Sequence, residues 1–381
     1  MRLVEAIGGI VVIVAAVELW LRRVNPVADP YERFKRLQTP NRYIPSEFPP
    51  KARVAIEVEA GLPGLRPGRR IFTTNNLGLR GDELLMPKPS GEIRVFLTGD
   101  SVAECLFLED QQAISGVLQH ALAGAASDGC VVKVYNAARS HDASDDQLSL
   151  IVHRLLHLQP DLIVLCLGVG ELLAGLDGRD PLHRVDGTGT RHSFLRLLRL
   201  VATELQIFRR LFALLSGVPA SSIRAEEVLH SRCREKAAHH RQLPLAAEPP
   251  RVNLAMFTTN LRTIAGSLKA HGVPLVFMTQ QATWNSLVDP GVRQWHWRLG
   301  RRGWRYREAD TAEALEAINE AIRQCAASQE VPVYDFSRIV PKSREFFYDD
   351  VHVNAKGAEA AGKGLAGFIV EQGLLSAPAA R

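Results

Sequence analysis

The feature that most constrains the fold of this chain is a series of short, largely apolar segments that alternate with amphipathic helical patterns. Five segments are predicted to be buried strands, and they cover residues 93–97, 131–135, 162–168, 274–279 and 331–334. Helical spacing is found in residues 111–126, 145–158, 253–270, 311–328 and 355–372. Apolar strands that alternate with helices form a parallel sheet covered on both faces. The sequence therefore predicts an α/β fold in three layers.

Composition fits a globular chain and excludes several classes of protein. Hydrophobic residues make up 46% and charged residues 23% of the 381 residues, which is enough to bury a core. The net charge of +5 is too weak to indicate a nucleic-acid partner. The 5 cysteines include no CxxC pair, which excludes a zinc ribbon or disulfide scaffold. The spacing of Cys233 and its neighbouring histidines matches no standard metal site, so we expect neither a metal nor a cofactor.

The N-terminal segment 3–21 has the character of a membrane helix. Its unbroken apolar run covers only residues 6–17. The run reaches the ~20 residues that a bilayer requires if it is extended across Glu5 and Glu18 to the whole of 3–21. The segment ends without the small residues of a signal-peptide cleavage site. We therefore expect residues 1–25 to form an uncleaved transmembrane anchor, with an ordinary buried N-terminal helix as the alternative. The flanking charges leave the membrane orientation open.

The remaining chain divides into a proline-rich arm, residues 26–90, and a body, residues 91–375. Two insertions, 172–252 and 283–308, interrupt the alternation of strands and helices in the body. The first insertion contains an apolar amphipathic helical pattern at 194–215. That helix is predicted either to lie on a membrane surface or to pack on the body or a partner.

The second insertion is both aromatic and basic. It contains four of the 5 tryptophans, and six arginines without any acid fall between residues 293 and 307. One interpretation is a lid that stacks sugar rings and attracts an acidic chain. The other is a structural hairpin whose arginines lie over aromatic rings.

Chemically useful side chains follow the predicted strands. Gly99-Asp100-Ser101 comes directly after the first strand, and Asp349 and His352 precede the last helix. Ligands of parallel sheets bind beyond the carboxyl ends of the strands, where these residues are expected. A serine hydroxyl needs a neighbouring base to act as a nucleophile, and a carboxylate can orient that base. Each motif is common in turns, and their shared location is what indicates a Ser-His-Asp triad.

This pair of motifs, GDS and DxxH, resembles the SGNH or GDSL hydrolase family over about residues 75–372. The N-x-x-G-x-R-G stretch at 75–81 is similar to one in membrane-anchored bacterial members. The resemblance implies a flavodoxin-like three-layer fold and ester hydrolysis or acyl transfer. It also implies Ser101 as nucleophile, His352 as base and Asp349 as the group that orients His352. The usual placement of such enzymes implies a body that is periplasmic or otherwise extracytoplasmic.

Two blocks depart from the family pattern. His141 stands where the family has a glycine whose N–H donates to the oxyanion, and Gly170 stands where a donor asparagine is expected. We assign the oxyanion site to the N–H groups of Ser101 and His141, with Gly170 at a third position that lacks its donor side chain. Loss of one such donor slows catalysis by roughly 100- to 1000-fold. Arg139, His141 or a group from the tryptophan-rich segment is a candidate replacement.

Substrate contacts are expected from Arg139, Gln280, Trp284, Trp295, Trp297 and Arg298. The predicted function is that of a serine esterase or O-acyltransferase acting on a small acyl ester, for example acetyl on a cell-envelope polysaccharide. One alternative, motivated by Gly170, is a weak or inactive family member that binds or assembles glycan. The other, motivated by residues 194–215, is an esterase directed at lipids.

Overall fold

The structure is a computed structural model that describes residues 2–24, 44, 47–125, 129–176, 205–210, 228–284, 288–297, 300–301 and 303–375. The chain divides into two compact units. The smaller unit combines Met1–Thr39 with Asp180–Val228, and the larger combines Pro40–Arg179 with Leu229–Arg381. Arg298 and most of the amphipathic pattern at 194–215 lie outside the described residues.

The smaller unit contains helix α1 (Arg2–Val24), which coincides with the predicted anchor segment. Among the described residues, no helix is both long and apolar enough to cross a membrane, so the predicted transmembrane anchor is not supported. Glu18 interrupts the apolar run, and its carboxylate is only 7% exposed. It accepts hydrogen bonds from the N–H groups of Gln206 (2.8 Å) and Ile207 (3.1 Å), which gives α1 a polar contact within its own unit.

The larger unit is built on a five-stranded parallel sheet. Its strands are β3 (Glu92–Gly99), β4 (Val131–Asn136), β5 (Leu162–Cys166), β7 (Leu275–Met278) and β10 (Val333–Tyr334). They lie in the order β10-β7-β5-β3-β4. When these strands are numbered along the chain, the order is 2-1-3-4-5, as in flavodoxin-like folds. The predicted α/β fold with a flavodoxin-like parallel sheet is thereby confirmed.

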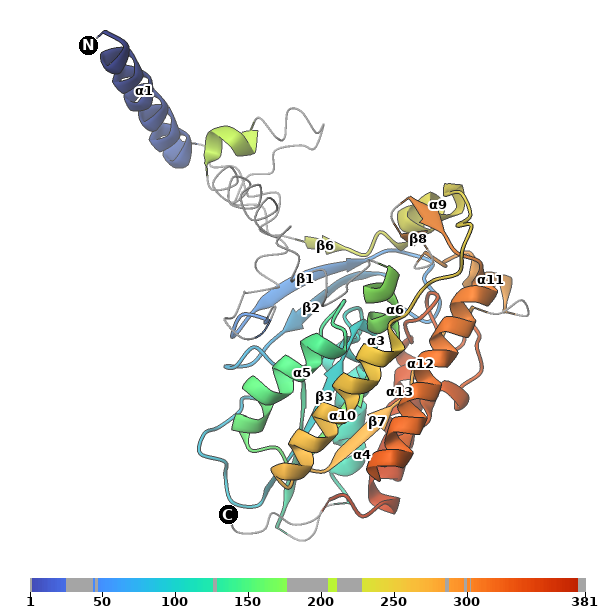
Figure 1. Cartoon of the computed structure of the whole chain (residues 1–381). Coiled ribbons are helices and arrows are strands. Elements are labelled where there is room, and N and C mark those ends of the chain that lie inside the picture. Colours follow the sequence, from blue (N-terminus) through green and yellow to red (C-terminus); the bar gives the residue numbers. More distant parts are fainter. Residues whose placement is uncertain are drawn as a thin grey trace. The chain divides into compact units, whose positions relative to one another are not determined.

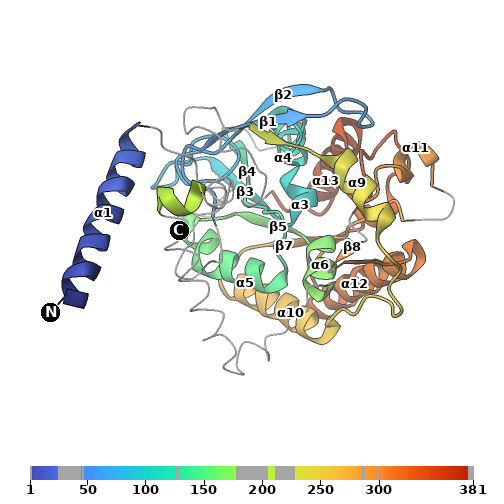
Figure 2. The ribbon, with the colours of Figure 1, turned by 90° about the horizontal axis from the view of Figure 1, so that it is seen from above.

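Helices cover both faces of this sheet (Figures 1 and 2). On one face lie α4 (Ile114–Leu122) and α13 (Ala355–Glu371), and on the other lie α5 (Ser144–His153), α10 (Leu254–Ala270) and α12 (Glu308–Gln329). Gly362 lets α13 approach α4 closely, because a Cβ there would lie 2.7 Å from Cγ1 of Val117. The helical layers and the sheet together form the predicted three-layer body.

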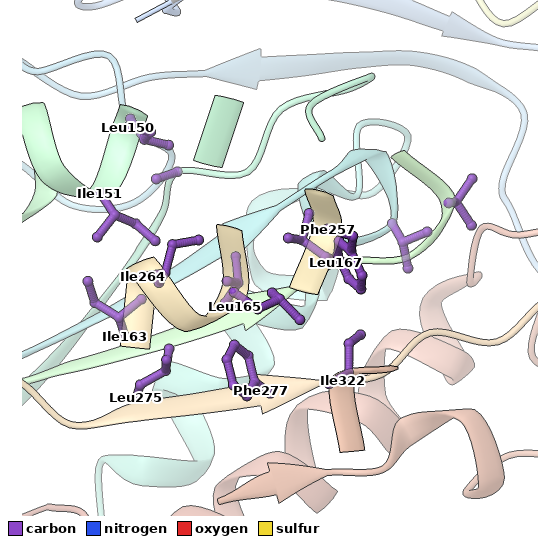
Figure 3. Packing of buried hydrophobic residues seen from close by; sticks show 14 of the residues in the cluster. Leu150, Ile151, Ile163, Leu165, Leu167, Phe257, Ile264, Leu275, Phe277 and Ile322 are labelled. Carbon is purple, nitrogen blue, oxygen red and sulfur yellow. The ribbon is translucent and has the colours of Figure 1, made fainter. Parts of the chain in front are cut away.

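Alternating side chains of β5 build the core beneath α5 and α10 (Figure 3). Ile163 and Leu165 point into a cluster with Phe257 of α10 and Phe277 of β7. Neighbouring β5 residues, such as Val164, are equally buried. Because side chains alternate along a strand, β5 is covered on both faces, which explains its continuous apolar sequence.

A second, antiparallel sheet comes from the proline-rich arm. β1 (Arg53–Val58) pairs with β2 (Gly68–Thr73), and β6 (Val228–His230) completes the three strands in the order β2-β1-β6. The remaining elements are short or belong to the insertions: α3 (Ser101–Glu104), η1 (Asp110–Gln112), η2 (Leu155–Leu158), α6 (Val169–Leu176), α9 (Cys233–Gln242), α11 (Pro290–Arg293), β8 (Gly300–Arg301), β9 (Trp304–Arg305) and η4 (Phe336–Arg338). The first insertion therefore contributes a strand to the arm's sheet.

The N-x-x-G-x-R-G stretch forms a tight turn that joins the arm to the body. The side-chain oxygen of Asn75 accepts the N–H groups of Leu77 (2.9 Å) and Leu79 (3.0 Å). Gly78 has a φ of +74°, and a Cβ there would lie 2.1 Å from the carbonyl oxygen of Phe48, so only glycine fits. The turn delivers Arg80, which is 3% exposed, to the loop that follows α3.

Candidate active site

The first strand of the parallel sheet ends at a glycine that places Ser101 at the rim. Gly99 has a φ of +144°, and a Cβ there would lie 1.9 Å from the carbonyl oxygen of Cys166 in β5. Ser101 begins the short helix α3 directly afterwards. β3 lies between β4 and β5, where the strand order reverses, and ligands of open α/β sheets bind at such a point.

Ser101, His352 and Asp349 form a continuous hydrogen-bonded chain. Oγ of Ser101 lies 2.9 Å from Nε2 of His352, and Nδ1 of His352 lies 2.7 Å from Oδ2 of Asp349. The carboxylate can only accept at Oδ2, so this network assigns a proton to Nδ1 and leaves Nε2 to accept from the serine hydroxyl. That tautomer is the one in which a histidine can take the serine proton.

The turn before α13 holds the histidine and the aspartate. Oδ1 of Asp349 accepts the N–H groups of Val351 (3.0 Å) and His352 (2.8 Å). The ring of Tyr348 stacks on the imidazole at a centroid distance of 5.4 Å and an interplanar angle of 9°. Asn354 caps α13 by accepting two backbone N–H groups at 3.1 Å each. The backbone and a stacked ring therefore orient both groups before any substrate binds.

Asp100, next to Ser101, connects the ends of three strands through hydrogen bonds. Its Oδ1 accepts the N–H of Val102 and Nε2 of Gln280, both at 2.9 Å, and its Oδ2 accepts the N–H of Gly170 at 2.6 Å. Burial raises the pKa of Asp100, although these hydrogen bonds oppose the shift. Gln280 is fully buried in this network, and its role in substrate binding stays a prediction. Sequence analysis missed Asp100 as a supporting group, although its place in the GDS motif was a signal.

A family comparison assigns this geometry to a known class. The model of the GDSL-like lipase/acylhydrolase family matches residues 97–360, which includes Ser101, Asp349 and His352. The chain belongs to the GDSL-like lipase/acylhydrolase family. Among curated proteins no sequence matched the chain.

Solved structures in this family's fold are similar at low identity. A lipase/acylhydrolase from Enterococcus faecalis shares 16% identity, with 74% of this chain and 96% of that chain covered and a TM-score of 0.41. An acetylxylan esterase from Geobacillus stearothermophilus shares 11% identity, with coverages of 74% and 94% and a TM-score of 0.42. Both similarities are too low to indicate a substrate.

The position of the GDSL family asparagine is closed to any side chain. A Cβ at Gly170 would lie 1.9 Å from the carbonyl oxygen of Asp142 and 2.9 Å from Cβ of Asp100. The N–H of Gly170 also donates to Asp100 and is directed away from an oxyanion role. Gly170 is therefore removed from the oxyanion site that the sequence predicted.

His141 adopts the backbone conformation that suits the glycine of the GDSL pattern. Its φ is +72°, in the left-handed region, which histidine adopts more readily than most residues. Its side chain is exposed, so the imidazole does not fill the interior of the site. Residue 141 thus has a backbone conformation that glycine adopts freely, with an exposed side chain.

The structure places Arg139 in a buried position against an aromatic ring. It is 5% exposed, and its guanidinium lies 3.8 Å from the centre of the Phe48 ring. Burial lowers its pKa, while the nearby carboxyls of Glu104 and Asp142 oppose that shift. The role of Arg139 in substrate binding, or as a replacement for the missing donor, stays a prediction.

Glu104 is a second carboxyl beside the nucleophile that sequence analysis missed. It lies three residues after Ser101 on α3, is 4% exposed and accepts the hydroxyl of Ser140. Burial raises the pKa of Glu104. This rise is partly offset by the hydrogen bond from Ser140 and by nearby charged groups, namely Arg139, Arg80 and His352. Its spacing from Ser101 was the available signal, because residues three apart share a helix face.

Only one of the described tryptophans predicted to bind substrate reaches the triad. Trp284 is 2% exposed and donates to Asp350 (3.3 Å), and Trp295 is 5% exposed. Both rings lie in the core, and their role in substrate binding stays a prediction. Trp297 is half-buried, and its Nε1–H donates to Oδ2 of Asp349 at 3.1 Å.

Two cations of α9 lie over tryptophan rings of the second insertion. Arg234 lies 5.6 Å from the ring centre of Trp295, and Lys236 lies 4.2 Å from that of Trp297. The interpretation of residues 283–308 as a structural hairpin whose own arginines lie over aromatic rings stays a prediction. Within the described part of the chain, no group of three or more histidine, cysteine or acidic side chains could hold a metal ion.

Proposed function

We propose that this protein is a serine esterase that cleaves short acyl esters. The observation that carries the proposal is the chain from Ser101 to His352 (2.9 Å) and on to Asp349 (2.7 Å). Membership of the GDSL-like lipase/acylhydrolase family supports an ester substrate.

In the proposed reaction, Oγ of Ser101 attacks the ester carbonyl while Nε2 of His352 takes the hydroxyl proton. Asp349 stabilises the resulting imidazolium through Nδ1–H. His352 then gives the proton to the leaving alcohol oxygen as the ester bond breaks, which leaves an acyl group on Ser101. Water, deprotonated by His352, attacks this acyl-enzyme and releases the acid. An alcohol in place of water would complete acyl transfer instead.

The proposed oxyanion site uses two backbone N–H groups. Ser101 is the first residue of α3, where N–H groups have no intrahelical acceptor, and His141 occupies the family's glycine position. Gly170 contributes no donor, because its N–H is bonded to Asp100. Loss of one donor costs roughly 100- to 1000-fold in rate, so we expect a slow enzyme.

The proposed preference for short acyl groups rests on the burial of the reacting side chains. Ser101 is 4% exposed and His352 is 8% exposed, with Tyr348 stacked on the imidazole. A long acyl chain would have to displace these neighbours. Acetyl on a cell-envelope polysaccharide, handled outside the cytoplasm, is the substrate and location we propose on the basis of the sequence.

Fluorophosphonate labelling of the intact chain tests the proposal, with Ser101→Ala as the matched control. We expect label on the wild type and none on the variant, and faster hydrolysis of 4-nitrophenyl acetate than of the octanoate. An unlabelled wild type with intact fold would refute the esterase. Faster octanoate hydrolysis would instead favour an enzyme directed at lipids.

The closed position at Gly170 favours a second candidate, a family member that binds glycan with little turnover. Acetate release from an acetylated polysaccharide separates the two candidates. Binding without acetate release, and without labelling of Ser101, would support the second.

A further inference from the structure

The insertion 283–308 supplies a direct contact to the catalytic carboxylate. Nε1–H of Trp297 donates to Oδ2 of Asp349 at 3.1 Å, and the same oxygen accepts Nδ1–H of His352 at 2.7 Å. Oδ1 accepts two backbone N–H groups, from Val351 and His352. Oδ2 of Asp349 thus accepts from two side chains, the indole and the imidazole, while Oδ1 accepts from the backbone.

The indole is itself held from several sides. The backbone N–H of Trp297 donates to Oδ2 of Asp350 at 3.3 Å, and Lys236 of α9 lies over the ring at 4.2 Å. Thr283, earlier in the same insertion, donates its N–H to the carbonyl oxygen of Asp350 at 2.8 Å. The insertion therefore forms hydrogen bonds with the Asp349–Asp350 turn at more than one point.

A second histidine–carboxylate pair lies behind this turn. Nε2 of His296 is 2.8 Å from Oγ1 of Thr283, and its Nδ1 is 3.2 Å from Oε1 of Glu308. Oγ1 of Thr283 also lies 3.4 Å from the carbonyl oxygen of Asp349. Thr283 is 0% exposed, so no substrate reaches it, and the pair can only support the turn from behind.

We propose that Trp297 is a positioning residue of the catalytic triad, which it serves by holding the carboxylate that orients His352. The proposal rests on the esterase function proposed above. Because both carboxylate oxygens of Asp349 accept hydrogen bonds, the carboxylate cannot rotate freely about the Cβ–Cγ bond. The indole N–H also takes up part of the negative charge, which limits how strongly Asp349 favours the imidazolium.

Trp297→Phe removes the N–H and keeps an aromatic ring beneath Lys236. We expect kcat to fall by about tenfold, the size of a lost hydrogen bond to a charged group, with little change in KM. Without the indole N–H, more of the negative charge on Oδ2 of Asp349 acts on His352. The imidazolium form of His352 is therefore favoured. The acid limb of the profile of kcat/KM against pH should therefore move to higher pH. A role limited to packing would leave that limb in place.

The matched control is Trp304→Phe. Trp304 lies on β9 in the same insertion and is 51% exposed, so we expect wild-type kinetics. Replacement of Trp297 by benzothienylalanine provides a second variant, because it keeps the size of the indole and lacks only the N–H. It should reproduce the effects of phenylalanine even if Trp297→Phe folds poorly.

An NMR titration of the His352 ring, assigned with His352→Gln, needs no turnover. The ring should titrate at higher pH in both Trp297 variants than in the wild type. This separates the two proposals, because an unlabelled Ser101 would refute the esterase while the ring titration would still report on Trp297. An unchanged ring titration and pH limb in the folded variants would overturn the role of Trp297.

Discussion

Gly170→Asn should damage the protein rather than improve it, although it restores the residue that the GDSL family pattern expects. The new Cβ would lie 1.9 Å from the carbonyl oxygen of Asp142 and 2.9 Å from Cβ of Asp100. Contacts that short require the backbone to move. The backbone at 170 is held by its 2.6 Å hydrogen bond to Asp100, the same residue that accepts from Gln280.

The loss of stability follows from two contributions. Overpacking of a well-packed core costs about 1–3 kcal/mol, and loss of a hydrogen bond to a carboxylate costs about 1.5–3 kcal/mol. Together they predict a decrease of about 2.5–6 kcal/mol in the free energy of unfolding. A typical domain has a stability of about 5–15 kcal/mol, so the variant should be close to unfolding.

Urea unfolding, followed by tryptophan fluorescence, measures this change. Gly124→Asn is the matched control, because a Cβ at Gly124 meets nothing within 4 Å. The control should stay within about 0.5 kcal/mol of the wild type. Hydrolysis of 4-nitrophenyl acetate is measured on the folded fraction. A Gly170→Asn variant as stable as the wild type, or one that hydrolyses the ester faster, would refute the reasoning.

Three further predictions follow from the hydrogen-bond network. Arg80→Met removes donors to the carbonyl oxygens of Glu104 (2.9 Å) and Cys105 (3.0 Å), so it should lower the free energy of unfolding by about 2–4 kcal/mol in urea and slow the labelling of Ser101. Asp349→Asn should reduce kcat by about 1000-fold or more at unchanged fold, because the amide favours the wrong imidazole tautomer; steady-state kinetics beside circular dichroism would show it. Burial alone would raise the pKa of Asp335, but hydrogen bonds, led by the one from Arg323, lower this pKa to about 2. The stability that Asp335 confers is therefore present above its unfolded pKa near 4 and is lost as the pH falls toward 2. Unfolding midpoints of wild type and Arg323→Met between pH 2 and 5 should converge at the acid end.

Local patterns were sufficient to predict the sheet and the motifs. The apolar run of β5 favoured a strand covered on both faces, and all five of its residues are buried. Ser101 and His352 are 251 positions apart, yet their positions after a strand and before a helix indicated the same rim. Boundaries were less certain, since α12 begins at Glu308 and not near residue 311, because no residue type marks that start.

Side-chain roles at the rim were harder to predict. Gln280 and Arg139 both follow strands, as substrate ligands often do, and both are buried in polar networks. A sequence position specifies the end of the sheet but not the direction of the side chain. That direction depends on which groups from other strands need hydrogen-bond partners, as Asp100 does.

The sequence by itself determined the layered α/β fold from periodicity, and positions relative to strand ends placed Ser101, Asp349 and His352 at one rim; both are local properties. The flavodoxin-like sheet and the roles of the three residues were what the resemblance to the SGNH or GDSL hydrolases implied. Only the tertiary structure decided that Gly170 has no room for a donor and that Trp297 reaches Asp349. Both depend on distances between segments far apart in the chain, and such distances are set by packing of the whole core.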